Sequence, residues 1–269
     1  MIKWTGQTDA FVTAKDMMLA TCAKIGMGGG RYQAIQYAGE AIHKLNMQER
    51  MTMSNMAAEL GAQAGLISPD ETTIEYLKSV NASILDNWQN YQIEKPDLNG
   101  EVINLDASSL SPQIAAPHSP ENSSDVDDFK NISFDIAYIG ACTGAKYTDL
   151  MAAASILKNR KVSSNVCLKV APASLRDQQR AEREGIMRIL EDAGAEFLPN
   201  SCGICAGYGS DRLLKEQVCI SSTARNFKGR MGDPSSKVYL ASPYTVAASA
   251  IAGTCLLYTS PSPRDFEAS

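Results

Sequence analysis

The sequence predicts an α/β fold with mostly parallel sheets. In the second half of the chain, apolar runs such as IAYIGA, VCLKVAP and VYLASP alternate with helix-length segments such as YTDLMAAASILKN. Runs that are apolar almost throughout are typical of strands covered on both faces, as the strands of a parallel sheet are. Their alternation with helical segments favours a parallel α/β sheet over an all-α or all-β domain.

Composition along the chain predicts two α/β domains and a break between them. We expect a partial first domain over residues 1–105, a linker over 106–130 and a second domain over 131–253. The segment SLSPQIAAPHSPENSSDVDDFKN is rich in Pro, Ser and Asp, which is typical of linkers and surface loops. Residues 254–269 form an atypical tail that is rich in Ser and Pro, and we expect it to be foreign to the fold.

In the first domain the pattern favours helices rather than strands. The predicted helices cover residues 13–25, 33–45 and 52–66, and a fourth begins at Ser68. Asn55 and Glu59 lie four residues apart in the third of these, so we expect them to share a helix face. The segment around them is otherwise small and apolar. A polar pair of this kind is either a solvated helix face or part of a site.

Composition excludes several classes of protein. The chain has 269 residues, a hydrophobic content of 44% and a formal charge of -5. The acidic balance does not match a nucleic-acid-binding surface, and no apolar run reaches the roughly 18–20 residues of a membrane span. The first residues lack the apolar region of a secretory signal. We therefore expect a cytoplasmic protein, or an organelle-matrix protein in a eukaryote, that binds neither nucleic acid nor membranes.

Three of the seven cysteines carry the strongest chemical signal. Cys142 directly follows the first predicted strand of the second domain, and Cys202 and Cys205 form a C-x-x-C after the third. Because sites in parallel sheets gather at the carboxyl ends of strands, we expect these thiols at one edge. Zinc and iron–sulfur sites usually take four protein ligands, so three thiolates favour a metal centre with an open position. An odd number of cysteines without a secretory signal also favours metal binding or catalysis over disulfides.

The C-x-x-C pair leaves two other interpretations open. A thioredoxin-like redox pair belongs at a helix N-terminus after the first strand of a small domain, whereas Cys202 and Cys205 lie in a glycine-rich segment. A zinc site needs a fourth ligand nearby, and Cys219 lies inside a predicted strand. We interpret the other cysteines as structural or incidental: Cys22, Cys167, Cys219 and Cys255.

Two arginines follow the fourth predicted strand of the second domain. Arg225 and Arg230 flank a turn in SSTARNFKGRMG. A guanidinium group binds a carboxylate through two parallel hydrogen bonds. Two such groups near a metal centre favour a di- or tricarboxylate substrate, and the alternative is a pair of ordinary surface arginines.

These segments together resemble the aconitase family. GACTGAKYTDLMAAA, LPNSCGICAG and STARNFKGRMG carry the resemblance, and MTMSNMAAELGAQAGLISPDET extends it upstream. It covers about residues 3–253 and is strongest to the branch of 3-isopropylmalate dehydratase large subunits and homoaconitase-like enzymes. It implies aconitase-like α/β/α domains and a hydro-lyase of amino-acid (leucine) biosynthesis. Such an enzyme reversibly dehydrates a hydroxy di- or tricarboxylate, such as 3-isopropylmalate or homocitrate/homoaconitate.

The resemblance also implies roles for individual residues. Family members hold a [4Fe–4S] cluster through three cysteines, which match Cys142, Cys202 and Cys205. The substrate carboxylates are bound by two arginines, which match Arg225 and Arg230. The catalytic Asn and Glu near the open iron and its ligands match Asn55 and Glu59.

The resemblance further implies partners. The base of the family is a serine on a swivelling domain or small subunit, and family large subunits begin with a further domain. We therefore expect an N-terminally truncated large subunit that is inactive without a small subunit. The sequence departs from the family pattern at Gly144 and Ala224, where the family commonly has Asn. A non-catalytic iron–sulfur or iron-sensing binding protein of the same family is the alternative.

Overall fold

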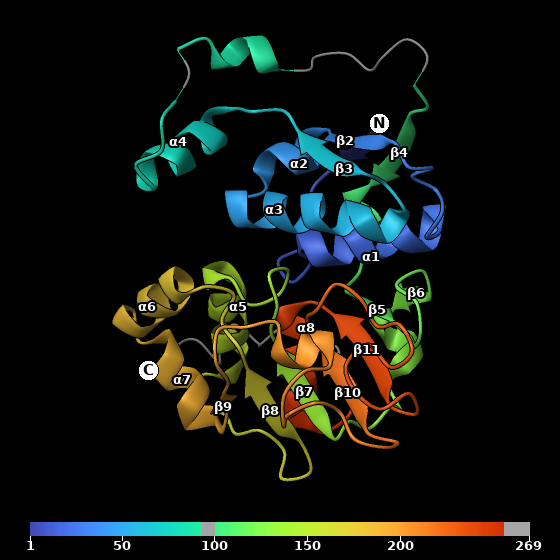
Figure 1. Cartoon of the computed structure of the whole chain (residues 1–269), viewed down its shortest axis with the longest axis vertical. Coiled ribbons are helices and arrows are strands. Elements are labelled where there is room, and N and C mark those ends of the chain that lie inside the picture. The colour runs from blue at the N-terminus through green and yellow to red at the C-terminus, as the bar shows by residue number, and fades with distance from the viewer. Residues whose placement is uncertain (85, 93–99, 256–269) are drawn as a thin grey trace. The chain divides into compact units, whose positions relative to one another are not determined.

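The computed structural model describes residues 1–84, 86–92 and 100–255. It divides into two compact units, Met1–Ser111 and a second that begins at Pro112. Each unit is built on a sheet of mostly parallel strands covered by helices, which confirms the predicted fold class (Figure 1). Residues 256–269, the greater part of the predicted tail, lie outside the described residues. Among the described residues, no helix combines the length and apolar character needed to cross a membrane.

The first unit contains a four-stranded sheet in the order β3-β2-β1-β4, with all neighbouring strands parallel. Its strands are β1 (Ile2–Thr5), β2 (Ala34–Ala38), β3 (Ala64–Ile67) and β4 (Ile103–Asp106). Its helices are α1 (Ala14–Ile25), α2 (Glu40–Lys44), α3 (Met47–Met56) and α4 (Glu71–Ser79). Short 3-10 turns are η1 (Ala57–Leu60), η2 (Trp88–Tyr91) and η3 (Ala107–Ser109).

Two of the helices predicted in this unit are wrong in part. Residues 34–38, inside the helix predicted over 33–45, form β2, in which every second side chain is buried. The helix predicted over 52–66 ends at Met56 and continues as η1. Gly61 then adopts a left-handed conformation with φ 72°, which turns the chain into β3.

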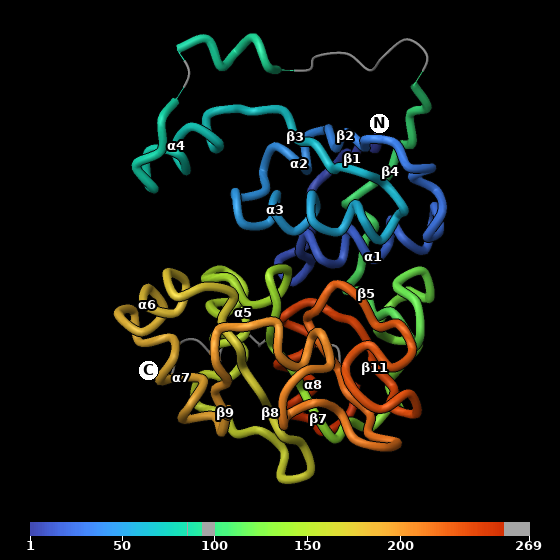
Figure 2. Tube along the Cα trace, in the orientation of Figure 1, coloured from blue at the N-terminus to red at the C-terminus, as the bar shows by residue number. Residues whose placement is uncertain are grey.

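The second unit contains a seven-stranded sheet in the order β6-β5-β11-β10-β7-β8-β9. Figure 2 traces the chain through it. Its strands are β5 (Gln113–Ala115), β6 (Ser123–Asp125), β7 (Ile136–Ile139), β8 (Cys167–Val170), β9 (Glu196–Phe197), β10 (Val218–Ser221) and β11 (Lys237–Ala241). Its helices are α5 (Tyr147–Leu157), α6 (Leu175–Arg183), α7 (Ile186–Ala193) and α8 (Pro243–Ala252), with 3-10 turns η4 (Val126–Phe129) and η5 (Gly203–Ala206). Helix α8 packs on β7, β10 and β11 and against α5.

The segment 106–130, which we expected to be a linker, contributes an edge to the second sheet. Strand β5 pairs antiparallel with β11, and β6 pairs antiparallel with β5. The amide of Gln113 donates a 2.7 Å hydrogen bond to Asp125 and ties the two strands together. Short edge strands tolerate Pro, Ser and Asp, so a composition typical of linkers also fits this hairpin.

Candidate functional site

The three candidate thiols follow the carboxyl ends of two strands in the second unit. Cys142 lies in the turn between β7 and α5, and Cys202 and Cys205 lie in the loop after β9, around η5. Strands β7, β8 and β9 are parallel neighbours, so these loops leave the sheet at the same edge. All seven cysteines are free thiols.

Cys205 lies within electrostatic range of the other two candidate thiols. Cys142 and Cys202 are exposed, whereas Cys205 is buried. Burial raises the pKa of the Cys205 thiol, the charge and hydrogen bond of Arg230 lower it, and the nearby thiols of Cys142 and Cys202 raise it. Such an effect requires that the sulfur atoms share one neighbourhood. Cys219, the possible fourth zinc ligand, is fully buried within β10.

A cluster and a single ion place different demands on their thiolate ligands. Zinc holds each thiolate at about 2.3 Å, which draws its ligands into one tight group. The described part of the chain contains no group of three or more His, Cys, Asp or Glu side chains that could hold a metal ion. In an iron–sulfur cluster the thiolates bind different irons, so they lie farther from one another than the thiolates around a single zinc ion. The soft thiolates of Cys142, Cys202 and Cys205 are donors of the kind that iron–sulfur clusters select.

Ser222 fixes the turn that carries Cys142. Its hydroxyl is completely buried, accepts a 3.1 Å hydrogen bond from the amide of Gly140 and donates a 2.9 Å bond to the carbonyl of Gly144. On the other side of the turn, Lys146 Nζ donates a 3.2 Å hydrogen bond to the carbonyl of Cys142. Both flanks of the cysteine are thus held by buried side chains.

Gly144 packs directly against Ser222, with no room for a side chain at position 144. A Cβ atom at Gly144 would lie 2.1 Å from the carbonyl oxygen of Ser222 and 2.5 Å from its Cβ. The backbone atom cannot move aside as a flexible side chain could. In this chain a side chain at position 144 does not fit against Ser222, so packing requires the glycine.

Gly144→Ala is expected to lower the free energy of unfolding by about 1–3 kcal/mol through overpacking of the Cys142 turn. Differential scanning calorimetry of the full chain would measure this loss. Gly28→Ala is the matched control, because a Cβ there meets no atom within 4 Å and its φ is ordinary. Equal melting profiles for the two variants would contradict the packing argument.

Arg230 contacts the C-x-x-C loop directly. Its Nε donates a 2.9 Å hydrogen bond to the carbonyl of Cys205. The turn is close-packed here, because a Cβ at Gly207 would lie 2.9 Å from the carbonyl oxygen of Arg230. Arg225 lies in the same β10–β11 loop and is partly buried. The structure thus brings one of the two predicted arginines to the thiols by a measured contact.

Asn226 anchors the arginine loop, and our sequence reasoning missed it. Its side chain is fully buried, and Nδ2 donates hydrogen bonds of 2.8 Å to Ala116 and 2.9 Å to Val238. Val238 belongs to β11, and Ala116 follows β5, so the amide fastens the loop to the sheet edge. A single sequence shows an asparagine between two arginines, but it does not show that the amide side chain is buried and bonded to the sheet.

The two predicted catalytic residues of the first unit do not share an α-helical face. Asn55 lies in the last turn of α3 and is exposed, whereas Glu59 lies in η1 and is 2% exposed. The change from α to 3-10 geometry after Met56 alters the angle between successive side chains, so a spacing of four no longer aligns them.

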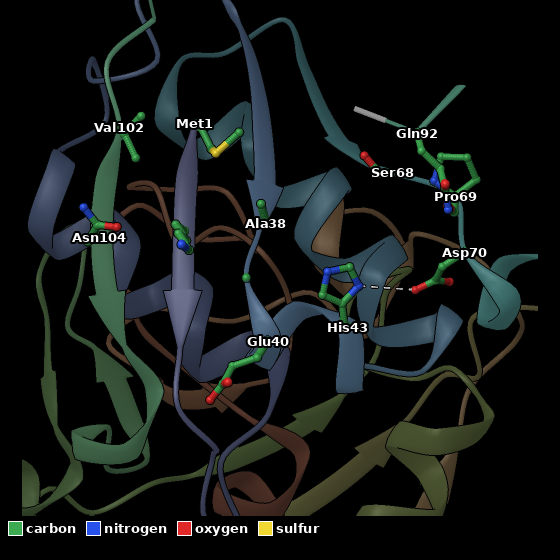
Figure 3. A pocket seen from close by; sticks show the side chains of 12 residues that line it. Met1, Ala38, Glu40, His43, Ser68, Pro69, Asp70, Gln92, Val102 and Asn104 are labelled. Carbon is green, nitrogen blue, oxygen red and sulfur yellow. Dashed lines mark hydrogen bonds and ion pairs between the residues drawn. The ribbon is translucent and has the colours of Figure 1, made fainter. Parts of the chain in front are cut away.

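A pocket of about 650 Å³ opens beside the sheet of the first unit (Figure 3). His43 lies in it, with Nδ1 3.5 Å from Oδ2 of Asp70. None of the predicted site residues lines this pocket. Asn55 instead lines a pocket of about 440 Å³ with apolar neighbours such as Met51 and Leu66.

Comparison with known proteins gives consistent results along the chain. The model of the aconitase family (aconitate hydratase) matches residues 1–132 and 126–253. The 3-isopropylmalate dehydratase large subunit 1 of Archaeoglobus fulgidus is 40% identical over 250 residues, which are 92% of this chain and 59% of the relative. That of Pyrococcus furiosus is 42% identical over 255 residues, which are 93% of this chain and 59% of the relative. The 3-isopropylmalate dehydratase large subunit of Hydrogenobaculum sp. is 42% identical over 248 residues, with shares of 92% and 58%.

Proposed function

The chain belongs to the aconitase family, and on that premise we propose that it is a large-subunit chain of an iron–sulfur hydro-lyase. It spans about 59% of the length of the relatives that it matches, so the activity of the whole protein is part of the proposal. The reaction we propose is reversible loss of water from a hydroxy di- or tricarboxylate, such as 3-isopropylmalate. The observation that carries the proposal is the neighbourhood of three thiols and the Arg230 guanidinium at one sheet edge.

We propose that Cys142, Cys202 and Cys205 hold a [4Fe–4S] cluster. When bound, the cluster would supply an iron with an open position, a Lewis acid that polarises the substrate hydroxyl. The turn around Cys142 is fixed by the hydrogen bonds of Ser222 and Lys146. Preorganised ligands reduce the ordering that metal binding requires.

Arg225 and Arg230 bind the carboxylates of the substrate in this proposal. The Nε of Arg230 is occupied by the carbonyl of Cys205, which fixes the plane of its guanidinium group. The terminal nitrogen atoms then point in a defined direction and suit two-point binding of a carboxylate. Asn226 holds the intervening backbone to the sheet, so both arginines are carried on an anchored loop.

Asn55 and Glu59 are the proposed catalytic residues of the first unit, in the roles that the family resemblance gives them. The relatives are named large subunits, and we therefore propose a small subunit as partner. That partner would supply the base that removes the proton α to a carboxylate. General-base assistance of this kind contributes about 10²–10⁴-fold to a rate.

Anaerobic reconstitution of the full chain with ferrous iron and sulfide tests the proposal. We expect about four irons and four sulfides per chain, with broad absorbance typical of iron–sulfur proteins. One zinc per chain without sulfide would instead support the zinc interpretation of the C-x-x-C pair. Addition of a small subunit from a relative then separates a hydro-lyase, which should turn over 3-isopropylmalate or a homologue, from a non-catalytic iron-binding protein.

A further inference from the structure

Tyr138 on β7 is a completely buried phenol whose hydroxyl has no hydrogen-bond partner among the described residues. A buried hydroxyl without a partner costs about 1–3 kcal/mol. Buried polar groups in folded proteins are nearly always satisfied, so each exception needs a physical explanation. The position of this hydroxyl suggests one.

Tyr138 lies on the face of the sheet that the C-x-x-C loop covers. In the parallel register it stands between Lys169 of β8 and Ser221 of β10, so all three side chains share one face. Lys169 forms an ion pair with Asp211, six residues after Cys205 in the same loop. The loop is therefore tied down over the strand position next to Tyr138.

The hydroxyl of Tyr138 also reaches toward the Cys142 turn. A Cβ at Gly140 would lie 2.1 Å from Cζ and 2.3 Å from the hydroxyl oxygen of Tyr138, so the end of the ring rests on that glycine. Gly140 precedes Cys142 by two residues. The phenolic oxygen is thus placed beside the chain segment that carries one candidate ligand and beneath the loop that carries the other two.

The sulfur atoms of that loop act on the phenol. Burial is the largest cause of a raised pKa for Tyr138, and negative charge on Cys205 and Cys202 of the loop, and on Cys219 of β10, raises it further. Negative charge on the sulfur atoms therefore favours the protonated hydroxyl, which is the form that can donate a hydrogen bond.

We propose that the hydroxyl of Tyr138 donates a hydrogen bond to a sulfur of the iron–sulfur site held by Cys142, Cys202 and Cys205. The inference rests on the proposed function and makes Tyr138 a positioning residue rather than a catalytic one. Hydrogen bonds to cluster sulfur and its ligands stabilise the reduced, more negative charge and retain the metal. The partner that the buried hydroxyl lacks is then a thiolate or sulfide.

Tyr138→Phe tests the proposal, because it removes the hydroxyl and keeps the ring over Gly140. The full chain is reconstituted anaerobically, and iron loss to a ferrous chelator is followed by absorbance. We expect about tenfold faster loss from the variant, the lower end of effects seen when groups outside the ligand shell are removed. Tyr239→Phe is the control: Tyr239 is also a buried tyrosine of this sheet, pairs in register with Ile220, and packs against Phe134 on the opposite face. It should release iron at the wild-type rate.

The melting temperature of the apo proteins provides a second readout, which distinguishes the proposed role of Tyr138 from a merely structural one. Since Tyr138→Phe deletes an unsatisfied buried hydroxyl, the melting temperature of the apo variant should equal or exceed that of the wild type. A less stable apo variant, or a wild-type rate of iron loss, would overturn the inference and leave the proposed function intact. Failure of the wild type itself to take up iron would overturn both.

Discussion

Replacing Cys202 with serine should abolish the retention of iron and sulfide by the full chain, whereas Cys167→Ser should leave it unchanged. Both thiols are exposed, so neither change disturbs the packed core. Cys167, however, is the first residue of β8 and lies at the amino end of the strand. Serine offers a hard oxygen in place of a soft thiolate, and iron–sulfur clusters select thiolates.

The expected result is a fall from about four irons per wild-type chain to less than about one in Cys202→Ser. Cys142→Ser and Cys205→Ser should behave in the same way, because three thiolates are the whole protein ligand set that we propose. Metal and sulfide analysis after desalting gives the number directly. Thermal unfolding of the apo variants shows whether the fold is intact. Full retention of iron by any of these three variants would remove that cysteine from the site.

The position of the three candidate thiols at one edge of the sheet could be anticipated because it follows from topology. Cys142, Cys202 and Cys205 come after strands that sequence patterns identify, and parallel strands end at the same edge. The contacts that hold the Cys142 turn in place cannot be predicted in this way. Ser222 meets Gly140 and Gly144 across 82 and 78 residues, and a single sequence contains no sign of such a pairing.

The errors in the first unit have a local cause. The helix prediction over 33–45 missed a five-residue strand, in which two buried side chains are too few to separate period two from period 3.6. The prediction over 52–66 ran through Gly61, whose left-handed conformation ends the helical segment. An α-helix continued past Met56 would place Asn55 and Glu59 on one face. The 3-10 turn η1, which begins at Ala57, removes that relation.

The second unit was predicted better because its central strands β7, β10 and β11 are buried along almost their whole length. Strands β7, β8, β10 and β11 each fall within an apolar run that the sequence marks. The same reasoning failed for β5 and β6, since strands of three residues are too short to form such a run. In the sequence, Tyr138 is only one of the apolar residues of the run IAYIGA. Its role depends on the direction of its hydroxyl, which is visible only in three dimensions.

Arg50 and Asp70 form a largely buried ion pair in the first unit. Arg50 is 2% exposed and binds both carboxylate oxygens of Asp70, at 2.6 and 2.7 Å. Its Nε donates to the carbonyl of Leu45, and Nη2, which also binds Asp70, donates to the carbonyl of His43, each at 3.0 Å. Asp70 in turn caps α4 by accepting a 3.2 Å hydrogen bond from the amide of Thr73. One guanidinium group thus joins the end of α2, helix α3 and the start of α4.

Arg50→Ala is expected to lower the free energy of unfolding of the first unit by about 3–5 kcal/mol, because it leaves a carboxylate and two carbonyls without their donor. Both tryptophans, Trp4 and Trp88, lie in this unit, so tryptophan fluorescence during urea unfolding reports on it alone. His43→Ala is the matched control: His43 contacts the same carboxylate but is 66% exposed, and its loss should cost less than about 1 kcal/mol. Equal losses in the two variants would contradict the importance of burial.

Because of the same ion pair, the stability of the first unit is expected to fall at acid pH. Burial raises the pKa of Asp70, but the hydrogen bonds and charge of Arg50, the Thr73 amide and His43 outweigh it and lower the pKa to about 2 from 3.8. A carboxyl with a lowered folded-state pKa stabilises the fold above its unfolded pKa and loses that contribution as the pH falls through the folded value. The difference corresponds to about 2 kcal/mol, lost between about pH 4 and pH 2. Asp70→Asn should therefore be less stable at neutral pH and should show a smaller loss of stability across this interval. A variant with the acid sensitivity of the wild type would assign that sensitivity to other carboxylates.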